Sequence, residues 1–415
     1  MRALVLVDGE HYAPVVRDAL GALPYEVAGA LLVGGTEKLR GGDDYGVPLV
    51  DSLDAVEAEI VIDLSDEPVL GPRERMLWAS RALALGLPYE GADFRFDPPR
   101  FHEVPCRSLA VVGTGKRVGK TAVTGHIARL LGRERRAVVV AMGRGGPPEP
   151  ELVAEPPRLE DLLAVARSGR HAASDHLETA VLTGVPTVGC RRAGGGLAGA
   201  TVDSNVLDGV EAALGLAPEL LVFDGSGAAL PPVAVDVRIL VTDGAHDVRA
   251  GLNAYRVLVS DLVVDTGGAD HDAIRGIADV PIVAAGLRLR PQCPLSGRRT
   301  AVFTAGPAAT GHLDGEVVHV SHNLARRDAL REELVRVEAD VYLVELKAAA
   351  VDVVVETALA RGAEVVLAAN DVVADDLDER ILELVGEPEV VAGGGSTEPQ
   401  RSAGAGSAGA LAGSA

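Results

Sequence analysis

Lysine is scarce in this chain. Only four of its 39 basic residues are lysine (Lys38, Lys116, Lys120 and Lys347), and the others are arginine. Arginine is a planar fork, whereas lysine is a compact point charge on a flexible stem. A chain that uses arginine almost everywhere should keep lysine where the fork cannot replace it. We therefore take the lysines as candidate functional residues.

Cysteine and long apolar runs are also scarce. The three cysteines are scattered, odd in number and not spaced as metal ligands, which is typical of reduced thiols in the cytoplasm. No apolar stretch is long enough to span a bilayer, and the run that follows Met1 is too short for a signal peptide. The sequence therefore predicts a cytoplasmic protein with no membrane partner.

The chain has fewer basic residues than acidic ones. The formal net charge is −21, so most of the surface should repel a phosphate backbone, and we expect no nucleic-acid partner. An anionic substrate would have to be captured by a local cluster of cations. The sequence has no clear marker of oligomeric state, and a homodimer is one assembly that it allows.

The order of the expected elements predicts an α/β fold. Short apolar runs bounded by Asp or Gly alternate with helical patterns, as in parallel sheets. We expect an N-terminal α/β domain over 1–100 and a larger core domain over 101–391. The core should be a doubly wound, mostly parallel P-loop NTPase sheet. The Gly/Ala/Ser-rich segment 392–415 is predicted to be a disordered tail. Expected core strands include Leu109–Val112, Ala137–Ala141, Leu220–Phe223, Val237–Val241 and Val257–Val264.

The most specific motif is a glycine loop between an expected strand and an expected helix. Such loops hold ATP because backbone N–H groups point at the phosphates, a lysine reaches the β and γ phosphates, and a hydroxyl binds Mg²⁺. The usual leading glycine is replaced by Thr114, with Gly113 one residue earlier. The candidate nucleotide-binding residues are Gly113, Thr114, Gly115, Lys116, Arg117, Val118, Gly119, Lys120 and Thr121.

Three residues are candidate Mg²⁺ ligands. Thr121 supplies the loop hydroxyl, and Asp224 ends an expected strand where P-loop folds carry a second acid. Glu149 lies in a Gly- and Pro-rich loop that also contains Arg144. Asp224 could instead be a plain strand-end cap, and the loop around Glu149 could simply be solvated.

Several loops combine glycine with cations and have no core-forming period. Free N–H groups and bidentate arginine suit a small polyanion, although solvated loops and structural histidines remain alternatives. The candidate substrate-binding residues are Arg144, His171, His176, Arg191 and Arg192. We expect Arg288, Arg290 and Lys347, which follow other strands, to be able to join the same pocket.

The first hundred residues carry two acidic segments that follow expected strands, Asp8–Tyr12 and Asp63–Pro68. Their carboxylates could cap the following helices or belong to a site. Arginines at 73, 75 and 81 are candidates to balance them.

Taken together, these segments resemble the cyclic 2,3-diphosphoglycerate synthetase family, and the glycine loop is similar to that of dethiobiotin synthetases. The resemblance covers the chain from its start to about Asp371, without the tail. Its most specific blocks are Val7–Tyr12, Asp63–Pro68, Gly113–Thr121, Met142–Pro148, Gly169–His176, Gly189–Arg192, Phe223–Gly227 and Glu345–Ala350.

The resemblance implies an ATP- and Mg²⁺-dependent ligase that closes an intramolecular phosphoanhydride in 2,3-bisphosphoglycerate, releasing ADP and phosphate. Catalysis would rest on Lys116, Lys120 and Lys347. The first two would stabilise charge on the transferring phosphoryl group. A substrate phosphate would take that group, and the neighbouring phosphate would then expel inorganic phosphate.

Two other classes stay open at this point. One is another P-loop ligase or kinase that acts on a small phosphorylated acid such as 2-phosphoglycerate. The other is a nucleotide-driven switch or metallochaperone, which should carry metal-ligand clusters or apolar partner-binding stripes. The arginine–glycine loops favour a small polyanionic substrate over the switch.

Overall fold

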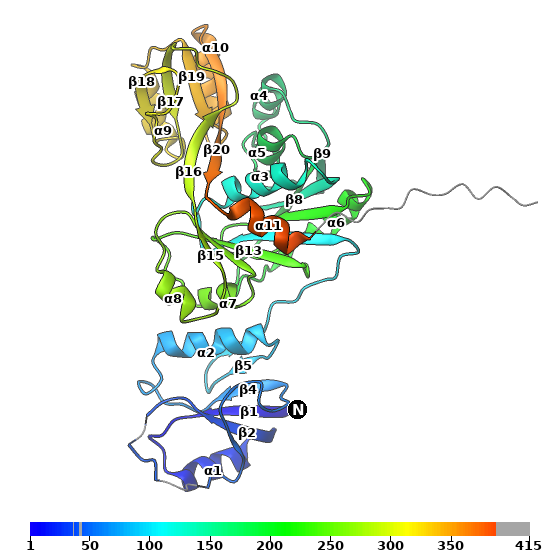
Figure 1. Ribbon diagram of the computed structural model, residues 1–415, viewed down its shortest axis with the longest axis vertical. Helices are drawn as coiled ribbons and strands as arrows, with labels where there is room; N and C mark the ends of the chain where they lie inside the picture. The colour runs from blue at the N-terminus through cyan, green and yellow to red at the C-terminus, as the bar shows by residue number, and fades with distance from the viewer. Residues whose placement is uncertain (36, 41–43, 387–415) are drawn as a thin grey trace, which may run out of the picture.

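The structure is a computed structural model that describes residues 1–35, 37–40 and 44–386, so the predicted tail lies outside the described residues. The described chain forms three sheets arranged along its longest axis, with the N-terminal sheet at one end and the C-terminal sheet at the other (Figure 1). Among the described residues, no helix is both long and apolar enough to cross a bilayer.

The N-terminal sheet has the strand order β3-β2-β1-β4-β5-β6 and is parallel except for β6. Its strands are β1 (Arg2–Val7), β2 (Glu26–Leu32), β3 (Leu49–Val50), β4 (Ile60–Asp63), β5 (Tyr89–Glu90) and β6 (Arg95–Phe96). Alternate residues of β1 face opposite sides, as the period of a strand requires. Ala3 and Val5 pack with α1 (Ala13–Ala22), whereas Leu4 and Leu6 pack with α2 (Pro72–Ala84).

The central sheet has nine strands, and its main path runs β11-β10-β8-β12-β7-β13-β14-β15. Its strands are β7 (Arg107–Gly113), β8 (Ala137–Gly143), β9 (Glu151–Val153), β10 (Thr187–Ala193), β11 (Asp203–Ser204), β12 (Leu220–Asp224), β13 (Val237–Thr242), β14 (Leu262–Asp265) and β15 (Ile282–Ala284). All pairs are parallel except those of β9 and β11 with β10. The glycine loop therefore leaves the middle of a parallel sheet.

Helices cover both faces of the central sheet. On one face, Leu109 and Val111 pack with α3 (Lys120–Leu131), and α5 (Asp175–Thr183) lies beside α3. On the other face lie α6 (Val206–Leu214), α7 (Asn253–Leu258) and α8 (His271–Arg275). This arrangement confirms the predicted doubly wound, parallel core.

The C-terminal sheet has the order β16-β20-β19-β17-β18, with β16 antiparallel. Its elements are β16 (Gly286–Pro291), β17 (Arg299–Phe303), β18 (Glu316–Ser321), α9 (Arg327–Leu334), β19 (Val341–Glu345), the π-helix η1 (Ala350–Val355), α10 (Glu356–Ala360) and β20 (Glu364–Val373). The chain then returns to the central sheet as α11 (Leu377–Val385). The stretch expected as one core, 101–391, thus contains two separate sheets.

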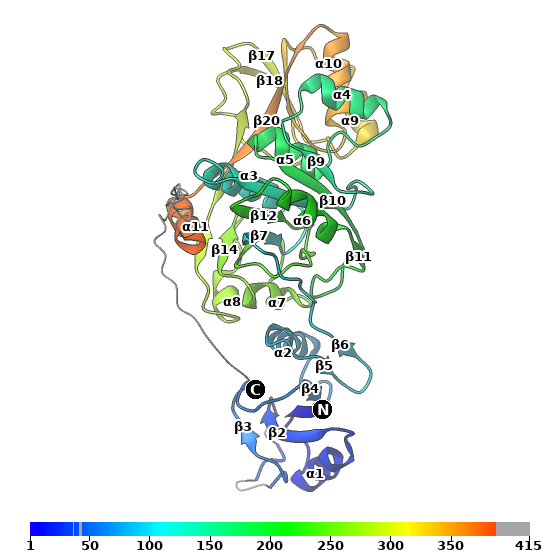
Figure 2. The same cartoon turned by 90° about the vertical axis from the view of Figure 1, so that its right-hand side faces the viewer.

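The C-terminal sheet packs against α5 and α4 (Leu159–Arg167), which stand beside it in both views (Figures 1 and 2). Leu163 and Leu177 share one apolar cluster with Phe303, Val344 and Val351. Burial of such side chains contributes about 1.5–3 kcal/mol each. The two helices therefore join the central and C-terminal sheets.

Two segments differ from the sequence-based expectations. The residues from Gly286 to Arg290, expected only to follow a strand, themselves form β16, because Leu287 and Leu289 alternate with the arginines and match the period of a strand. The predicted strand Val257–Val264 contains the end of α7 and only then β14. A continuous apolar run does not mark where a buried helix gives way to a buried strand.

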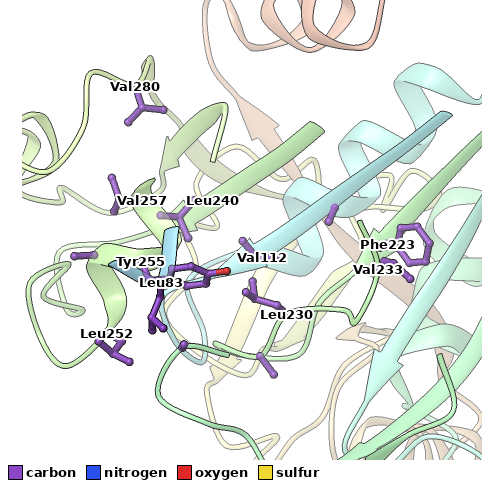
Figure 3. Close-up of a cluster of buried hydrophobic side chains, with 14 of the residues drawn as sticks. Leu83, Val112, Phe223, Leu230, Val233, Leu240, Leu252, Tyr255, Val257 and Val280 are labelled. Atoms are coloured by element: carbon purple, nitrogen blue, oxygen red, sulfur yellow. The ribbon is translucent and has the colours of Figure 1, made fainter. Parts of the chain in front are cut away.

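The N-terminal sheet meets the central one through α2 and α7, which pack together. Figure 3 shows Leu83 of α2 among Leu252, Tyr255 and Val257. An ion pair between Arg73 and Asp247 lies at the same junction. One apolar cluster is therefore shared by both sheets.

Arg256 on α7 is buried, with 2% of its surface exposed, and it bonds no carboxylate within residues 1–35, 37–40 and 44–386. Its guanidinium donates to the carbonyl oxygens of Ala228 at 2.8 Å, Leu197 at 3.0 Å and Leu252 at 3.2 Å. Leu197 and Ala228 belong to the loops that follow β10 and β12. Arg256 thus ties two loops at the carboxyl edge of the central sheet to α7.

We expect Arg256→Met to lower the free energy of unfolding by about 3 kcal/mol, because buried carbonyl groups lose charged donors. Urea denaturation measures the change. Arg275→Met on α8 is the matched control, since Arg275 is exposed and forms an ion pair with exposed Asp272, and it should change stability by less than about 0.5 kcal/mol. Equal stability of the two variants would show that Arg256 does not hold the loops.

Candidate functional site

The glycine loop runs from Gly113, the last residue of β7, to Gly119, which caps α3. Gly119 has φ of +79° and Arg117 has φ of +67°, so the chain turns through left-handed conformations at both positions. A side chain at 119 would also meet Leu287, whose Cδ1 lies 2.9 Å from the ideal Cβ position. The backbone geometry therefore requires glycine there.

Three contacts from the ends of β13 and β14 support the loop. The hydroxyls of Thr114 and Thr242 are 3.0 Å apart, and the Thr266 hydroxyl donates to the Val118 carbonyl at 2.8 Å. The ring of His246 fills the space that a side chain at Gly115 would need. The loop is held in shape before any ligand binds, which favours phosphate capture.

Asp224 lies beneath the loop at the end of β12, with 1% of its surface exposed. Its Oδ1 forms an ion pair with Lys120 and accepts a 2.7 Å hydrogen bond from Thr124. Its Oδ2 is buried and has no hydrogen-bond partner among the residues that the structure describes. An unsatisfied carboxylate oxygen beside the first turn of α3, where Thr121 lies, suits a hard cation such as Mg²⁺.

The loops that follow β8 and β12 lie beside the glycine loop, which itself follows β7. A methyl group on Gly227 would lie 2.9 Å from Nη2 of Arg144 and 3.9 Å from Cγ of Lys116. Arg144 and Lys116 are both exposed, and within the described chain neither forms a hydrogen bond or ion pair. This edge therefore presents two available cations.

Arg192 and Arg191 have different environments. The guanidinium of Arg192 is buried and donates to the carbonyls of Gly194 at 3.1 Å and Ser226 at 2.8 Å. Its Nε has no partner in the described part of the chain. Burial lowers the pKa of Arg192, and the charge of Arg144 lowers it further. Arg191 is exposed, and its backbone N–H donates to Asn205.

The two candidate histidines also lie in different environments. His171 is exposed, with Cδ2 at 3.9 Å from the ideal Cβ position of Gly145. His176 is buried under Gly189, and its Nε2 lies 3.9 Å from a carboxylate oxygen of Glu151. Burial lowers the pKa of His176. His176 therefore has the surroundings of a core residue, whereas His171 remains near Arg144.

Glu149 is exposed and has no hydrogen bond or ion pair with any described residue. Glu151, two residues further on, pairs with Arg170 at 2.5 Å. Asp224 is thus the predicted acid that lies against the glycine loop.

Lys347 comes directly after Leu346, just beyond β19, and points to the central domain. Its Nζ lies 2.5 and 2.6 Å from the two carboxylate oxygens of Glu178 on α5. Burial raises the pKa of Glu178 to about 7, although Lys347 opposes this change. Burial alone would lower the pKa of Lys347, but Glu178 outweighs it and raises that pKa. Lys347 thus links two domains.

The acidic segments of the N-terminal sheet are internally satisfied. Asp8 accepts from His11 at 2.7 Å, and Asp63 accepts from Tyr89 at 2.7 Å and pairs with Arg75 at 2.9 Å. Of the other two arginines considered there, Arg73 pairs with Asp247 and Arg81 lies over the ring of Trp78.

Arg288 and Arg290 do not join the glycine-loop pocket. With Arg129 of α3 and Arg133, which follows that helix, they line a separate cavity of about 770 Å³ next to α11, and this lining includes no residue of the glycine loop. Arg290 pairs there with Asp371 at 2.8 Å.

His246 was not among the predicted site residues, although the sequence contains a repeated Asp-Gly-x-His pattern that marks it. Asp243-Gly-Ala-His246 follows β13 just as Asp8-Gly-Glu-His11 follows β1. In both turns the aspartate Oδ1 lies 2.7 Å from the histidine Nδ1, and it also accepts a backbone N–H two residues on. The repeated turn holds His246 against the glycine loop with Nε2 as its remaining ring nitrogen.

Comparison with known proteins gives three family models that together cover most of the chain. Residues 2–97 match the N-terminal domain of cyclic 2,3-diphosphoglycerate synthetase, residues 108–278 match its P-loop domain, and residues 298–371 match its C-terminal domain. The three matched segments correspond to the three sheets.

Individual proteins agree with the models. A cyclic 2,3-diphosphoglycerate synthetase of Rubrobacter xylanophilus is 49% identical and is aligned over 92% of this chain and 97% of its own length. That of Thermococcus kodakarensis is 42% identical over 92% of this chain and 98% of its own. A solved structure, LpxK from Aquifex aeolicus in complex with ATP, is 16% identical with a TM-score of 0.41, covering 69% of this chain and 89% of that one. A likeness this distant carries no argument about function.

Glu178 generates a prediction about pH. The folded carboxyl has a pKa of about 7, against an ordinary value of 4.5, so between these values the folded chain holds a proton that the unfolded chain releases. The free energy of unfolding should therefore fall as pH rises from about 4.5 to about 7 and then level off. Glu178→Gln cannot titrate and should remove this part of the fall.

Urea denaturation between about pH 5 and about pH 8 tests this prediction. Glu332→Gln on α9 is the control, since Glu332 is exposed, and it should keep the wild-type slope. The prediction fails if Glu178→Gln keeps that slope as well.

Proposed function

The chain belongs to the cyclic 2,3-diphosphoglycerate synthetase family, and on that premise we propose that it uses ATP to close the phosphoanhydride ring of 2,3-bisphosphoglycerate. The other products are ADP and inorganic phosphate. The observation that carries the proposal is the position of two cations that have no partner among the described residues, Lys116 within a preformed phosphate loop and Arg144 beside it. An acidic chain has a physical reason to gather cations there if its substrate carries two phosphates and a carboxylate.

ATP would bind with its phosphates on the backbone N–H groups of Gly113–Thr121 and the start of α3. Lys120 would exchange part of its contact with Asp224 for the β and γ phosphates, which are the stronger anions. Asp224 Oδ2 and the Thr121 hydroxyl would hold Mg²⁺, which when bound neutralises charge on those phosphates. The unsatisfied state of Oδ2 supports this assignment.

The first chemical step transfers the γ-phosphoryl group. An oxygen of one substrate phosphate attacks the γ-phosphorus, the bond to ADP breaks, and a new phosphoanhydride forms on the substrate. Lys120 and Lys116 would stabilise the charge that spreads over the transferring group. Arg144 would hold the attacking phosphate in line.

The second step closes the ring. An oxygen of the neighbouring substrate phosphate attacks the phosphorus that carries the new anhydride, and inorganic phosphate leaves. The attacking phosphate and the diphosphate that it attacks are both anions, so proximity and neutralisation by cations should supply most of the rate. Arg144 and the free Nε of Arg192 are candidates to neutralise this pair.

Lys120→Arg should lower kcat by about 10²-fold or more, because a guanidinium cannot reproduce a point charge at the γ-phosphoryl group. Retaining a cation beside Asp224 avoids leaving that carboxylate buried and unpaired. Lys38→Arg is the control, because Lys38 lies in the N-terminal domain and pairs with Glu37, and its kcat should match the wild type. Near-normal turnover by Lys120→Arg would contradict the assignment.

Phosphorus NMR of a reaction with 2,3-bisphosphoglycerate, ATP and Mg²⁺ tests the reaction itself. We expect one ADP, one inorganic phosphate and one acid with both phosphorus atoms in an anhydride for each turnover. A kinase acting on 2-phosphoglycerate would release no free phosphate, and a switch NTPase would leave the acid unchanged. ADP and phosphate without an anhydride signal from the acid would refute the synthetase proposal.

A further inference from the structure

A small cavity lies where the central and C-terminal domains meet. Its volume is about 240 Å³. The central domain contributes the segment between α4 and α5, and the C-terminal domain contributes the start of α9 and the turn between Lys347 and η1. We call it the interdomain cleft, and its polar or turn-forming lining residues are Gly169, Arg170, His171, Arg327, Ala348 and Asp352.

Among the side chains that line the interdomain cleft and can carry charge, most are basic. Arg170 and Arg327 each have one carboxylate partner, Glu151 and Asp352 respectively. His171 has no hydrogen bond or ion pair with any residue in the described ranges. Of the lining side chains that can carry charge, three can be cationic and one, Asp352, is anionic. In a chain with a net charge of −21, this local excess favours an anionic ligand.

A short series of neighbouring residues leads from the glycine loop to the cleft. Lys116 and Arg144 both lie near Gly227. Arg144 is followed by Gly145, whose ideal Cβ position is 3.9 Å from His171. His171 lines the cleft. A small molecule could therefore touch the glycine-loop cations at one end and the cleft at the other.

We propose that the interdomain cleft binds the anionic group of the three-carbon substrate that faces away from ATP. This inference rests on the proposed function and extends it, because it gives the C-terminal domain a direct contact with substrate. Arg327 would leave its ion pair with Asp352 and bind a phosphate or carboxylate of the substrate instead. His171 and Arg170 would hold the same group from the central domain.

The domain arrangement supports this assignment. Lys347 pairs with buried Glu178 and joins the two walls of the cleft. The next residue, Ala348, has φ of +39°, a left-handed conformation that is costly for alanine and is common at ligand sites. Both features fix the turn that lines the cleft. The cleft therefore has the walls of a subsite that forms only when the C-terminal domain is docked on α5.

Calorimetric titration of 2,3-bisphosphoglycerate into the full chain with ADP and Mg²⁺ tests the proposal without needing turnover. Arg327→Gln should raise the Kd for the acid about tenfold, because it removes one charged contact. The Kd for ADP and the Tm should stay at wild-type values. Arg331→Gln is the matched control, one turn further along α9, where the side chain is exposed and pairs with exposed Asp328.

Asp352→Asn separates binding from a structural role of the ion pair. If Arg327 contacts the substrate, Asp352→Asn leaves the acid bound as tightly as in the wild type, or more tightly. A rise in Kd for Asp352→Asn equal to that of Arg327→Gln would overturn the proposal. So would an unchanged Kd for Arg327→Gln. Failure of the proposed function is a different result, namely wild-type chain that forms no cyclic product by phosphorus NMR.

Discussion

The contact between Asp224 and Lys120 is the constraint on which the site depends. A carboxylate buried to this degree is stable only if its charge is paired. The pairing needs β12 in register beside β7, with Asp224, the last residue of β12, opposite Val111, two residues before β7 ends. It also needs α3 to start at once after the loop, which Gly119 makes possible through its left-handed backbone. Sheet register, loop turn and helix start are thus tied to one ion pair.

The same edge of the sheet explains why arginine appears in two roles. Arg256 and Arg192 are buried, and their guanidinium groups bond backbone carbonyls of the loops that follow β10 and β12. They replace the hydrogen bonds that irregular backbone would otherwise take from water. With those loops fixed, Arg144 remains exposed and unpaired among the described residues, next to Gly227. Structural arginines therefore hold the surface on which a ligand-binding arginine stands.

The sequence was informative where one continuous segment carries the function. The glycine loop and the strand before it were predictable because the turn, lysine and hydroxyl follow one another along the chain. Asp224 was predictable from its place at a strand end. The environments of His176 and Lys347 were not, because they depend on residues far away, such as Glu178, which is 169 positions from Lys347. That the strands of the C-terminal segment form a separate sheet was not predicted for a similar reason, since strand pairing between distant segments leaves no local mark. His246 could have been found, because its turn repeats one already noted at Asp8.

At three of the four lysine positions, the structure gives a physical reason for lysine rather than arginine. Lys116 and Lys120 stand at the phosphate loop, where a compact charge suits a phosphoryl group. Lys347 places a compact charge between both oxygens of a buried carboxylate on α5. Because α5 packs beside α3, the helix that begins at the phosphate loop, this ion pair links the docking of the C-terminal domain to the nucleotide site. A guanidinium is wider than an ammonium, so an arginine at position 347 would push the two domains apart. This is a reason for lysine to persist there in a chain that otherwise prefers arginine.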